Sequence, residues 1–178
     1  VQYEKANSII EYGSGGSTLL AAKLAKQIVT VESCNSWLIE LLGSAAEQRL
    51  PGTIIPIWVD VGPTGDWGTP KDESKWKNWH KYPKNPWLYC NEHNILPDLV
   101  LIDGRYRVAC FLATCIYAKK ETIVLFDDYE PRKHYHTVEK LFEKVDVIDD
   151  RMAVFRILPN QLSSRALLDR LHFFNDVR

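Results

Sequence analysis

The alternation of strand-length apolar segments with helix-length amphipathic segments constrains the fold of this chain more than any other feature. The expected strands lie at residues 8–12, 28–32, 53–61, 98–103 and 122–126. The expected helices lie between them, at about 17–27, at about 35–49 and from residue 108. Repeated strand–helix–strand units form a mostly parallel sheet with helices on its faces. The pattern therefore predicts an α/β fold, and we expect one domain over residues 1–178.

The end of the chain departs from this alternation. Two strands are expected at 145–148 and 153–158, and a link as short as 149–152 forces them to be antiparallel. A short helix around residues 138–142 precedes them, and a last amphipathic helix is expected at 161–175. The third strand contains Pro56, which cannot donate to a ladder and so places that strand at a sheet edge.

Residues 62–97 lack regular periodicity and hold four of the six tryptophans. Such aromatic density argues against disorder, so we expect an ordered Trp-rich insertion. Its lysines alternate with aromatic residues between 71 and 84. We favour a lid or substrate wall over two alternatives, structural cover and a nucleic-acid contact. His80 lies in this stretch and is a candidate general base.

The amino-acid composition argues against several classes of binding partner. The net charge of −1 argues against a general polyanion binder, so nucleic acid is not favoured. No apolar run is long enough to cross a membrane. The four cysteines form no CxxC pair and are too sparse for a disulfide framework, which favours a reducing, cytoplasmic location. A small-molecule substrate is the expected partner, and the residues do not specify an oligomeric state.

A glycine cluster follows the first expected strand. The segment from Glu11 to Thr18 reads EYGSGGST and joins that strand to a helix. Such a turn lets a ligand approach the backbone at the helix N-terminus. Thr18 stands where a dinucleotide fingerprint would require its third glycine, and no Walker lysine is present. Glu32 ends the second strand, where an acid can bind ribose hydroxyls.

These residues resemble motif I of the class I S-adenosylmethionine-dependent methyltransferases. The resemblance rests on Glu11-x-Gly13-x-Gly15, on Glu32, and on the closing antiparallel strand pair. The segments VDVGPTGDWGTP, LIDGRYRVAC and LFDDY further resemble a small methyltransferase-like group. The resemblance implies a Rossmann-like, seven-stranded sheet in the order 3-2-1-4-5-7-6 and S-adenosylmethionine as cofactor. The cofactor contacts it implies are Glu11, Gly13, Ser14, Gly15, Ser17, Glu32, Asp60 and Asp103.

Within this resemblance, Asp60 at the end of the third strand would contact the adenine ring. Asp103 ends the fourth strand, and Asp127 and Asp128 end the fifth, which is its neighbour in such a sheet. The three carboxylates should therefore converge beside the methyl donor. This layout is similar to the metal-dependent catechol and caffeoyl-CoA O-methyltransferases, which carry Asp-Asn where this chain has Asp-Asp.

Like carboxylates held close repel one another, and the pKa of one of them should rise unless a cation lies nearby. Mg²⁺ or Ca²⁺ is one choice, and the guanidinium of Arg105 or Arg107 is the one we favour over a metal. Turn chemistry alone is the alternative explanation for the aspartates.

The expected activity is methyl transfer to a small or moderately sized acceptor, with Asp103, Asp128 or His80 as the base. Two alternatives stay open at this point. One is a non-catalytic nucleotide-binding module on the same fold. The other is a nicotinamide-dependent oxidoreductase, which Thr18 and the closing hairpin disfavour.

Overall fold

The computed structural model describes residues 2–178 and contains one seven-stranded sheet in the order β3-β2-β1-β4-β5-β7-β6. This order confirms the predicted one. The strands are β1 (Ser8–Tyr12), β2 (Gln27–Glu32), β3 (Thr53–Trp58), β4 (Leu99–Ile102), β5 (Thr122–Phe126), β6 (Lys144–Ile148) and β7 (Met152–Ile157). The first five run parallel to one another, and β7 is antiparallel to both β5 and β6.

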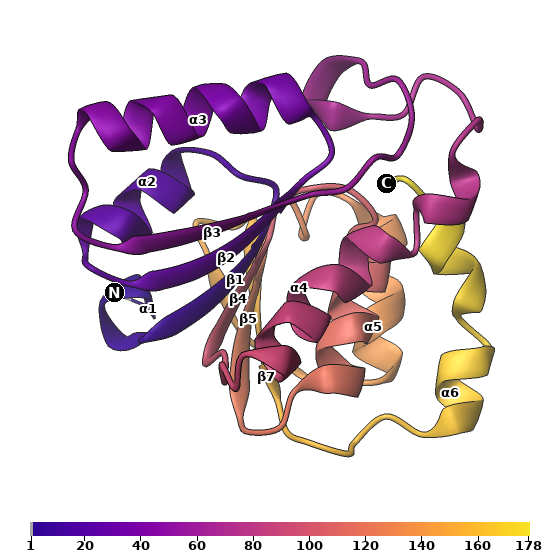
Figure 1. Cartoon of the computed structure of the whole chain (residues 1–178). Helices are drawn as coiled ribbons and strands as arrows, with labels where there is room; N and C mark the ends of the chain where they lie inside the picture. The colour runs from indigo at the N-terminus through magenta and orange to yellow at the C-terminus, as the bar shows by residue number, and fades with distance from the viewer. Residues whose placement is uncertain (1) are drawn as a thin grey trace.

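The helices connect these strands on both sides of the sheet. The α-helices are α1 (Gln2–Lys5), α2 (Gly16–Lys23), α3 (Asn35–Glu47), α4 (Lys81–Glu92), α5 (Arg107–Tyr117) and α6 (Ser164–Leu168). The 3-10 helices are η1 (Asp66–Gly68), η2 (Trp76–Asn78), η3 (Lys133–Lys140) and η4 (Leu171–Asn175). Helices α2 and α3 lie on one side of the sheet and α4 and α5 on the other (Figure 1).

Each face of the sheet has its own apolar core. Successive strand residues point to opposite faces, so Ile9 of β1 packs with Ala21 of α2, whereas Ile10 packs with Trp87 of α4 and Phe111 of α5. Strand β4 is buried at all four positions, as expected for a central strand covered on both faces. Strand β3, which contains Pro56, lies at the edge as predicted.

The structure corrects three expectations about local structure. The Trp-rich insertion at 62–97 contains a regular helix, α4, so only its first part is irregular. The helix expected at 161–175 is two short pieces, α6 and η4, and the helix around 138–142 is the 3-10 helix η3. None of the helices in the described part of the chain combines the length and apolar character that a bilayer crossing requires.

Candidate active site

A cavity of about 900 Å³ opens at the carboxyl ends of β1, β2, β4 and β5. The strand order reverses between β1 and β4, and ligands of open α/β sheets bind at such a point. Seven of the predicted catalytic and cofactor-binding residues line this cavity: Gly13, Ser14, Gly15, Ser17, Glu32, Asp103 and Asp128. The loops after four different strands therefore contribute to one site.

The glycine loop after β1 lies against the loop after β4. Gly13 has φ +89°, a conformation that favours glycine, and an added Cβ would lie 2.7 Å from the Cα of Gly104. Gly13 also donates its backbone N–H to the carbonyl of Val31 at 3.0 Å. The loop ends at the N-terminus of α2, whose first amide groups have no partner within the helix and suit a polar or anionic ligand group.

Glu11 lies beneath this loop and is fully buried. Its carboxylate accepts hydrogen bonds from the hydroxyls of Ser17 and Thr18 in the first turn of α2. Burial raises the pKa of Glu11 to about 7, against the hydrogen bonds, which lower it. Glu11 is not among the residues that line the cavity. It therefore holds the glycine loop through Ser17 and Thr18, and its expected contact with the cofactor stays a prediction.

This raised pKa makes stability depend on pH. The folded chain holds the Glu11 proton up to about pH 7, whereas an unfolded chain loses it near the ordinary glutamate pKa of 4.5. Because the folded state binds more protons in this window, the contribution of Glu11 to stability is greatest below pH 4.5 and is lost as the pH rises to 7.

We expect the unfolding free energy of the wild type, measured relative to that of Glu11→Gln, to fall by at most about 3 kcal/mol between pH 4.5 and pH 7. Urea unfolding from pH 4.5 to 8 measures it, with Glu47→Gln at the exposed end of α3 as the control. A difference that does not change with pH would contradict this assignment.

Glu32 lies at the end of β2 with its carboxylate on the cavity wall. One oxygen accepts backbone N–H groups from Ser33 at 2.7 Å and Cys34 at 2.9 Å. The other accepts the N–H of Ser14 in the glycine loop at 3.2 Å. The carboxylate thus ties the loops after β1 and β2 together, and the oxygen that accepts from Ser14 has fewer protein donors than the oxygen that accepts from Ser33 and Cys34.

The first part of the Trp-rich insertion forms another wall of the same cavity, through Gly65, Trp67 and Gly68. The carbonyl of Gly68 accepts the Ser33 hydroxyl at 2.9 Å. Gly68 has φ +70°, and an added Cβ would lie 2.4 Å from that hydroxyl oxygen. Trp67 has φ +58° and is 90% exposed. The first part of the insertion therefore shares this cavity with the glycine loop, and its expected role as a lid or substrate wall stays a prediction.

Two predicted site residues lie outside the cavity lining. Asp60 accepts the N–H of Gly62 at 3.1 Å and pairs with Lys75 at 3.4 Å, so it stabilises the turn after β3. His80 is exposed at the N-terminus of α4. Partial burial and the charges of nearby lysines lower its pKa. Their expected roles, Asp60 beside the adenine and His80 as a base, stay predictions.

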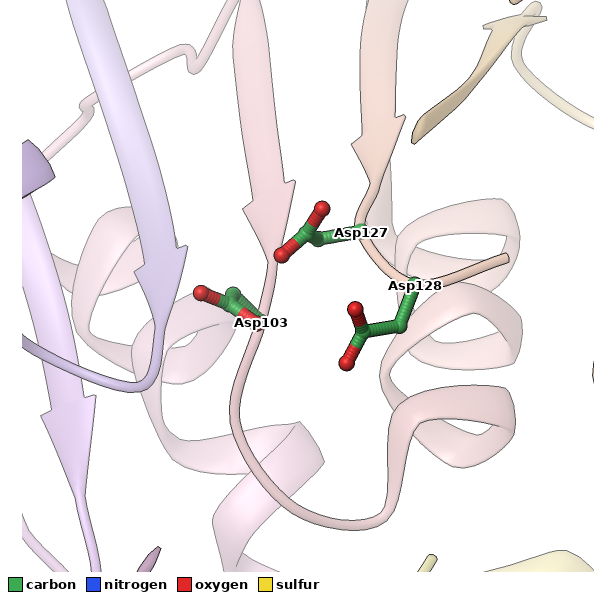
Figure 2. Close-up of side chains that lie close together, drawn as sticks. All are labelled: Asp103, Asp127 and Asp128. Atoms are coloured by element: carbon green, nitrogen blue, oxygen red, sulfur yellow. The ribbon is translucent and has the colours of Figure 1, made fainter. Parts of the chain in front are cut away.

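The acid cluster consists of Asp103, Asp127 and Asp128, which gather between the ends of β4 and β5 (Figure 2). One carboxylate oxygen of each lies within 4.8 Å of the others. Successive residues of an extended strand point to opposite sides, but Asp128 has φ +53° and turns back beside Asp127. The predicted convergence of the three carboxylates is confirmed.

Asp103 projects into the cavity, and its surroundings raise its pKa to about 6. Desolvation by the cavity walls is the main cause, and the carboxylates of Asp127 and Asp128 add to it. Arg107 opposes the rise through an ion pair of 3.1 Å. A carboxylate with a pKa near 6 is largely ionised at neutral pH and can take a proton from a ligand.

Arginines supply the positive charge beside this cluster. Arg107 is one of the two residues that the sequence suggested, and it pairs with Asp103 and Asp128. Arg105 lines the cavity but points elsewhere, toward the hydroxyl of Thr69 at 3.4 Å.

Similarity to known proteins decides the family. No protein-family model matches the chain, and no curated protein matches it. A crystal structure of a methyltransferase-like protein from Silicibacter pomeroyi DSS-3 shares 37% sequence identity with it. The TM-score is 0.90, over 98% of this chain and 90% of that protein. The chain belongs to the class I methyltransferase family.

A more distant member of this methyltransferase fold is the O-methyltransferase from Bacillus cereus, solved in complex with S-adenosylhomocysteine. It is 14% identical, with a TM-score of 0.57 over 89% of this chain and 76% of that protein. At this level of identity the likeness is one of fold.

Two charged residues of the cavity in this methyltransferase-family chain, Arg132 and Arg151, were not predicted from the sequence. Arg132 lies just before η3, and Arg151 lies in the turn between β6 and β7. Each forms an ion pair with Asp128. Arg132 follows the Asp127-Asp128 pair at the i+4 spacing from Asp128, which is the one sequence signal that could have revealed it. Arg151 reaches the cavity only because of the order of the strands in the sheet.

Proposed function

We propose that this protein transfers the methyl group of S-adenosylmethionine to a small-molecule acceptor. The observation that carries the proposal is the meeting of three features in one cavity: the glycine loop after β1, the Glu32 carboxylate after β2, and the acid cluster after β4 and β5. The first two suit a nucleoside joined to a polar chain. The third supplies carboxylates where a positively charged sulfonium and an acceptor would meet.

The cofactor would lie along the ends of β2, β1 and β4. Its ribose hydroxyls would donate to Glu32, and its methionine part would lie against the backbone of Gly13–Ser17 at the start of α2. The adenine would then lie near Ser33 and Gly68, where the insertion meets the end of β2. This arrangement leaves Asp60 without a cofactor contact.

The chemistry requires little beyond alignment of the acceptor, the methyl carbon and sulfur. A lone pair of the acceptor oxygen or nitrogen forms the new bond to the methyl carbon. The carbon–sulfur bond breaks, and its electron pair stays on sulfur, which becomes the neutral thioether of S-adenosylhomocysteine. The acceptor proton passes to a carboxylate, and the insertion would help to exclude water.

Asp103 is the best placed of the three candidate bases. It lines the cavity, and a pKa of about 6 leaves it ionised yet basic at neutral pH. Asp128 also lines the cavity, but arginines engage both of its oxygens. His80 does not line the cavity.

Trp67 offers an optical signal for ligand binding. It is 90% exposed on the cavity wall, so a bound purine or acceptor would change its surroundings. We expect S-adenosylhomocysteine to quench tryptophan emission and Trp67→Phe to remove most of that change. Trp76→Phe is the matched control, because Trp76 is half-exposed outside the cavity lining. If S-adenosylhomocysteine quenches the emission of both variants to the same extent, the ligand binds away from Trp67.

A turnover assay tests the proposed function. The protein is incubated with S-adenosylmethionine and a panel of metabolites that carry hydroxyl or amine groups, and mass spectrometry follows both S-adenosylhomocysteine and methylated products. We expect at least one acceptor to be methylated by the wild type and not by Glu32→Ala. Cofactor binding with no turnover on the panel would favour the non-catalytic binding module instead.

A further inference from the structure

The acid cluster faces guanidinium groups, and Arg107 contacts two of its members. The Nη2 group of Arg107 is 3.1 Å from Oδ1 of Asp103, and its Nη1 group is 3.6 Å from Oδ2 of Asp128. A cation that joined the carboxylates after β4 and β5 would need these same oxygens. Arg107 therefore stands where such a cation would act.

Arg107 cannot leave this position without a large penalty. Its side chain is only 3% exposed. It donates from Nε to the carbonyl of Gly104 at 3.0 Å, from Nη1 to that of Asp127 at 2.7 Å, and from Nη2 to that of Asp103 at 3.2 Å. Rotation of the side chain would leave buried donors and carbonyl oxygens unpaired. Its charge is also permanent at any ordinary pH.

Two more arginines engage the outer oxygens of the cluster. Arg151 donates to Oδ2 of Asp127 at 2.5 Å and to Oδ1 of Asp128 at 2.9 Å. Arg132 pairs with Oδ2 of Asp128 at 2.7 Å. These two side chains are about half-exposed, in contrast to Arg107. They can move more freely, so they do not fix the cluster as Arg107 does.

The donor set does not fit a divalent metal. Three carboxylates already face three guanidinium groups, which leaves no excess of negative charge to attract a divalent cation. Mg²⁺ requires near-octahedral oxygen ligands at about 2.0–2.1 Å. An ion at that distance from Oδ1 of Asp103 and Oδ2 of Asp128 would lie beside the fixed charge of Arg107 and be repelled by it.

We propose that the acid cluster is a metal-independent site in which the buried guanidinium of Arg107 takes the place of a divalent cation. The negative charge of the three carboxylates is matched by the chain's own guanidinium groups, which pair with each of them. The inference concerns the chain's own charges, and its consequence for the acceptor rests on the proposed function.

That consequence is a wider class of acceptor. A divalent ion in the cluster would take oxygen ligands from the acceptor as well as from the protein. Without the ion, an acceptor needs only one hydroxyl or amine beside Asp103, which receives its proton. We therefore expect acceptors with a single nucleophilic group to be methylated even where no neighbouring oxygen is present.

Binding of Mn²⁺ to the protein without cofactor tests the inference independently of any turnover. Electron paramagnetic resonance measures free Mn²⁺ as protein is added. We expect the wild type and Asp103→Asn to leave the same amount of Mn²⁺ free, because the acid cluster of the wild type binds none. We expect Arg107→Met to bind Mn²⁺ at least tenfold more tightly than the wild type. Arg156→Met is the control, because Arg156 pairs with Glu121 outside the cavity.

A second variant keeps the test decisive if Arg107→Met does not fold. The double substitution of Arg132 and Arg151 by Gln removes only the half-exposed arginines, and we expect it to leave Mn²⁺ unbound because Arg107 remains. Binding of Mn²⁺ by this variant, or by the wild type in a manner that requires Asp103, would overturn the proposal. So would a loss of methyl transfer in chelator that added Mg²⁺ restores.

Discussion

Replacement of Asp103 by Asn is expected to lower kcat by about 10²–10⁴-fold, because the variant keeps the shape of the side chain but cannot accept the acceptor's proton. Binding of S-adenosylhomocysteine should change by less than about threefold, since its neutral sulfur does not depend on the lost charge. Asp169→Asn is the control, because Asp169 is exposed beyond the cavity lining. Unchanged kcat in Asp103→Asn would exclude Asp103 as the base.

The pH profile provides a second readout of the same assignment. The pKa of Asp103 is raised to about 6, and the base works only when it is deprotonated. The wild-type rate should therefore fall as the pH drops through about 6, and the residual rate of Asp103→Asn should lose this dependence. A structural role for Asp103 would leave the shape of the profile unchanged.

Replacement of Glu32 by Ala is expected to weaken cofactor binding by about 1.5–3 kcal/mol, or roughly 10- to 150-fold in Kd. The variant loses the acceptor for the ribose hydroxyls. It also leaves the N–H groups of Ser14, Ser33 and Cys34 without the partner that orders both loops. Calorimetry with S-adenosylhomocysteine measures the loss.

Glu40→Ala on the exposed face of α3 is the matched control for that experiment. A Glu32→Ala variant that binds as tightly as the control would show that the ribose lies elsewhere. Circular dichroism distinguishes a local loss of binding from a loss of fold.

The sequence predicted the sheet because its strands carry strong and simple signals. The run from Leu99 to Ile102 is apolar throughout, which only a central strand covered on both faces requires. Pro56 marked an edge, and the short link after Ile148 marked an antiparallel pair. The residues at the strand ends followed from this order, since parallel strands bring their carboxyl ends to one edge of the sheet.

Helix α4 was missed because proline obscures its apolar stripe. Its buried residues, Tyr82, Pro83, Pro86, Trp87 and Cys90, recur at helical spacing, but two prolines within six residues argue against a helix when read alone. Pro83 falls in the first turn, where proline is tolerated, and burial against the sheet compensates for Pro86. Tertiary packing thus determines the helical conformation of a segment whose local sequence preferences do not predict it.

The sequence also did not predict where the loops direct their charged side chains. Asp60 and His80 have the right chemistry for a site, yet the loops direct them to Lys75 and to solvent. Arg151 comes from a hairpin turn that reaches the cavity only because β7 lies beside β5. Sequence spacing cannot encode such a contact, because three separate segments meet there.

A calorimetric titration of the intact protein with S-adenosylhomocysteine tests the central claim most directly. We predict one ligand per chain with a Kd below about 1 mM, which corresponds to at least about 4 kcal/mol of binding free energy, and no detectable heat with NADH at the same concentrations. Absence of S-adenosylhomocysteine binding at millimolar ligand, or binding of NADH in its place, would contradict the account.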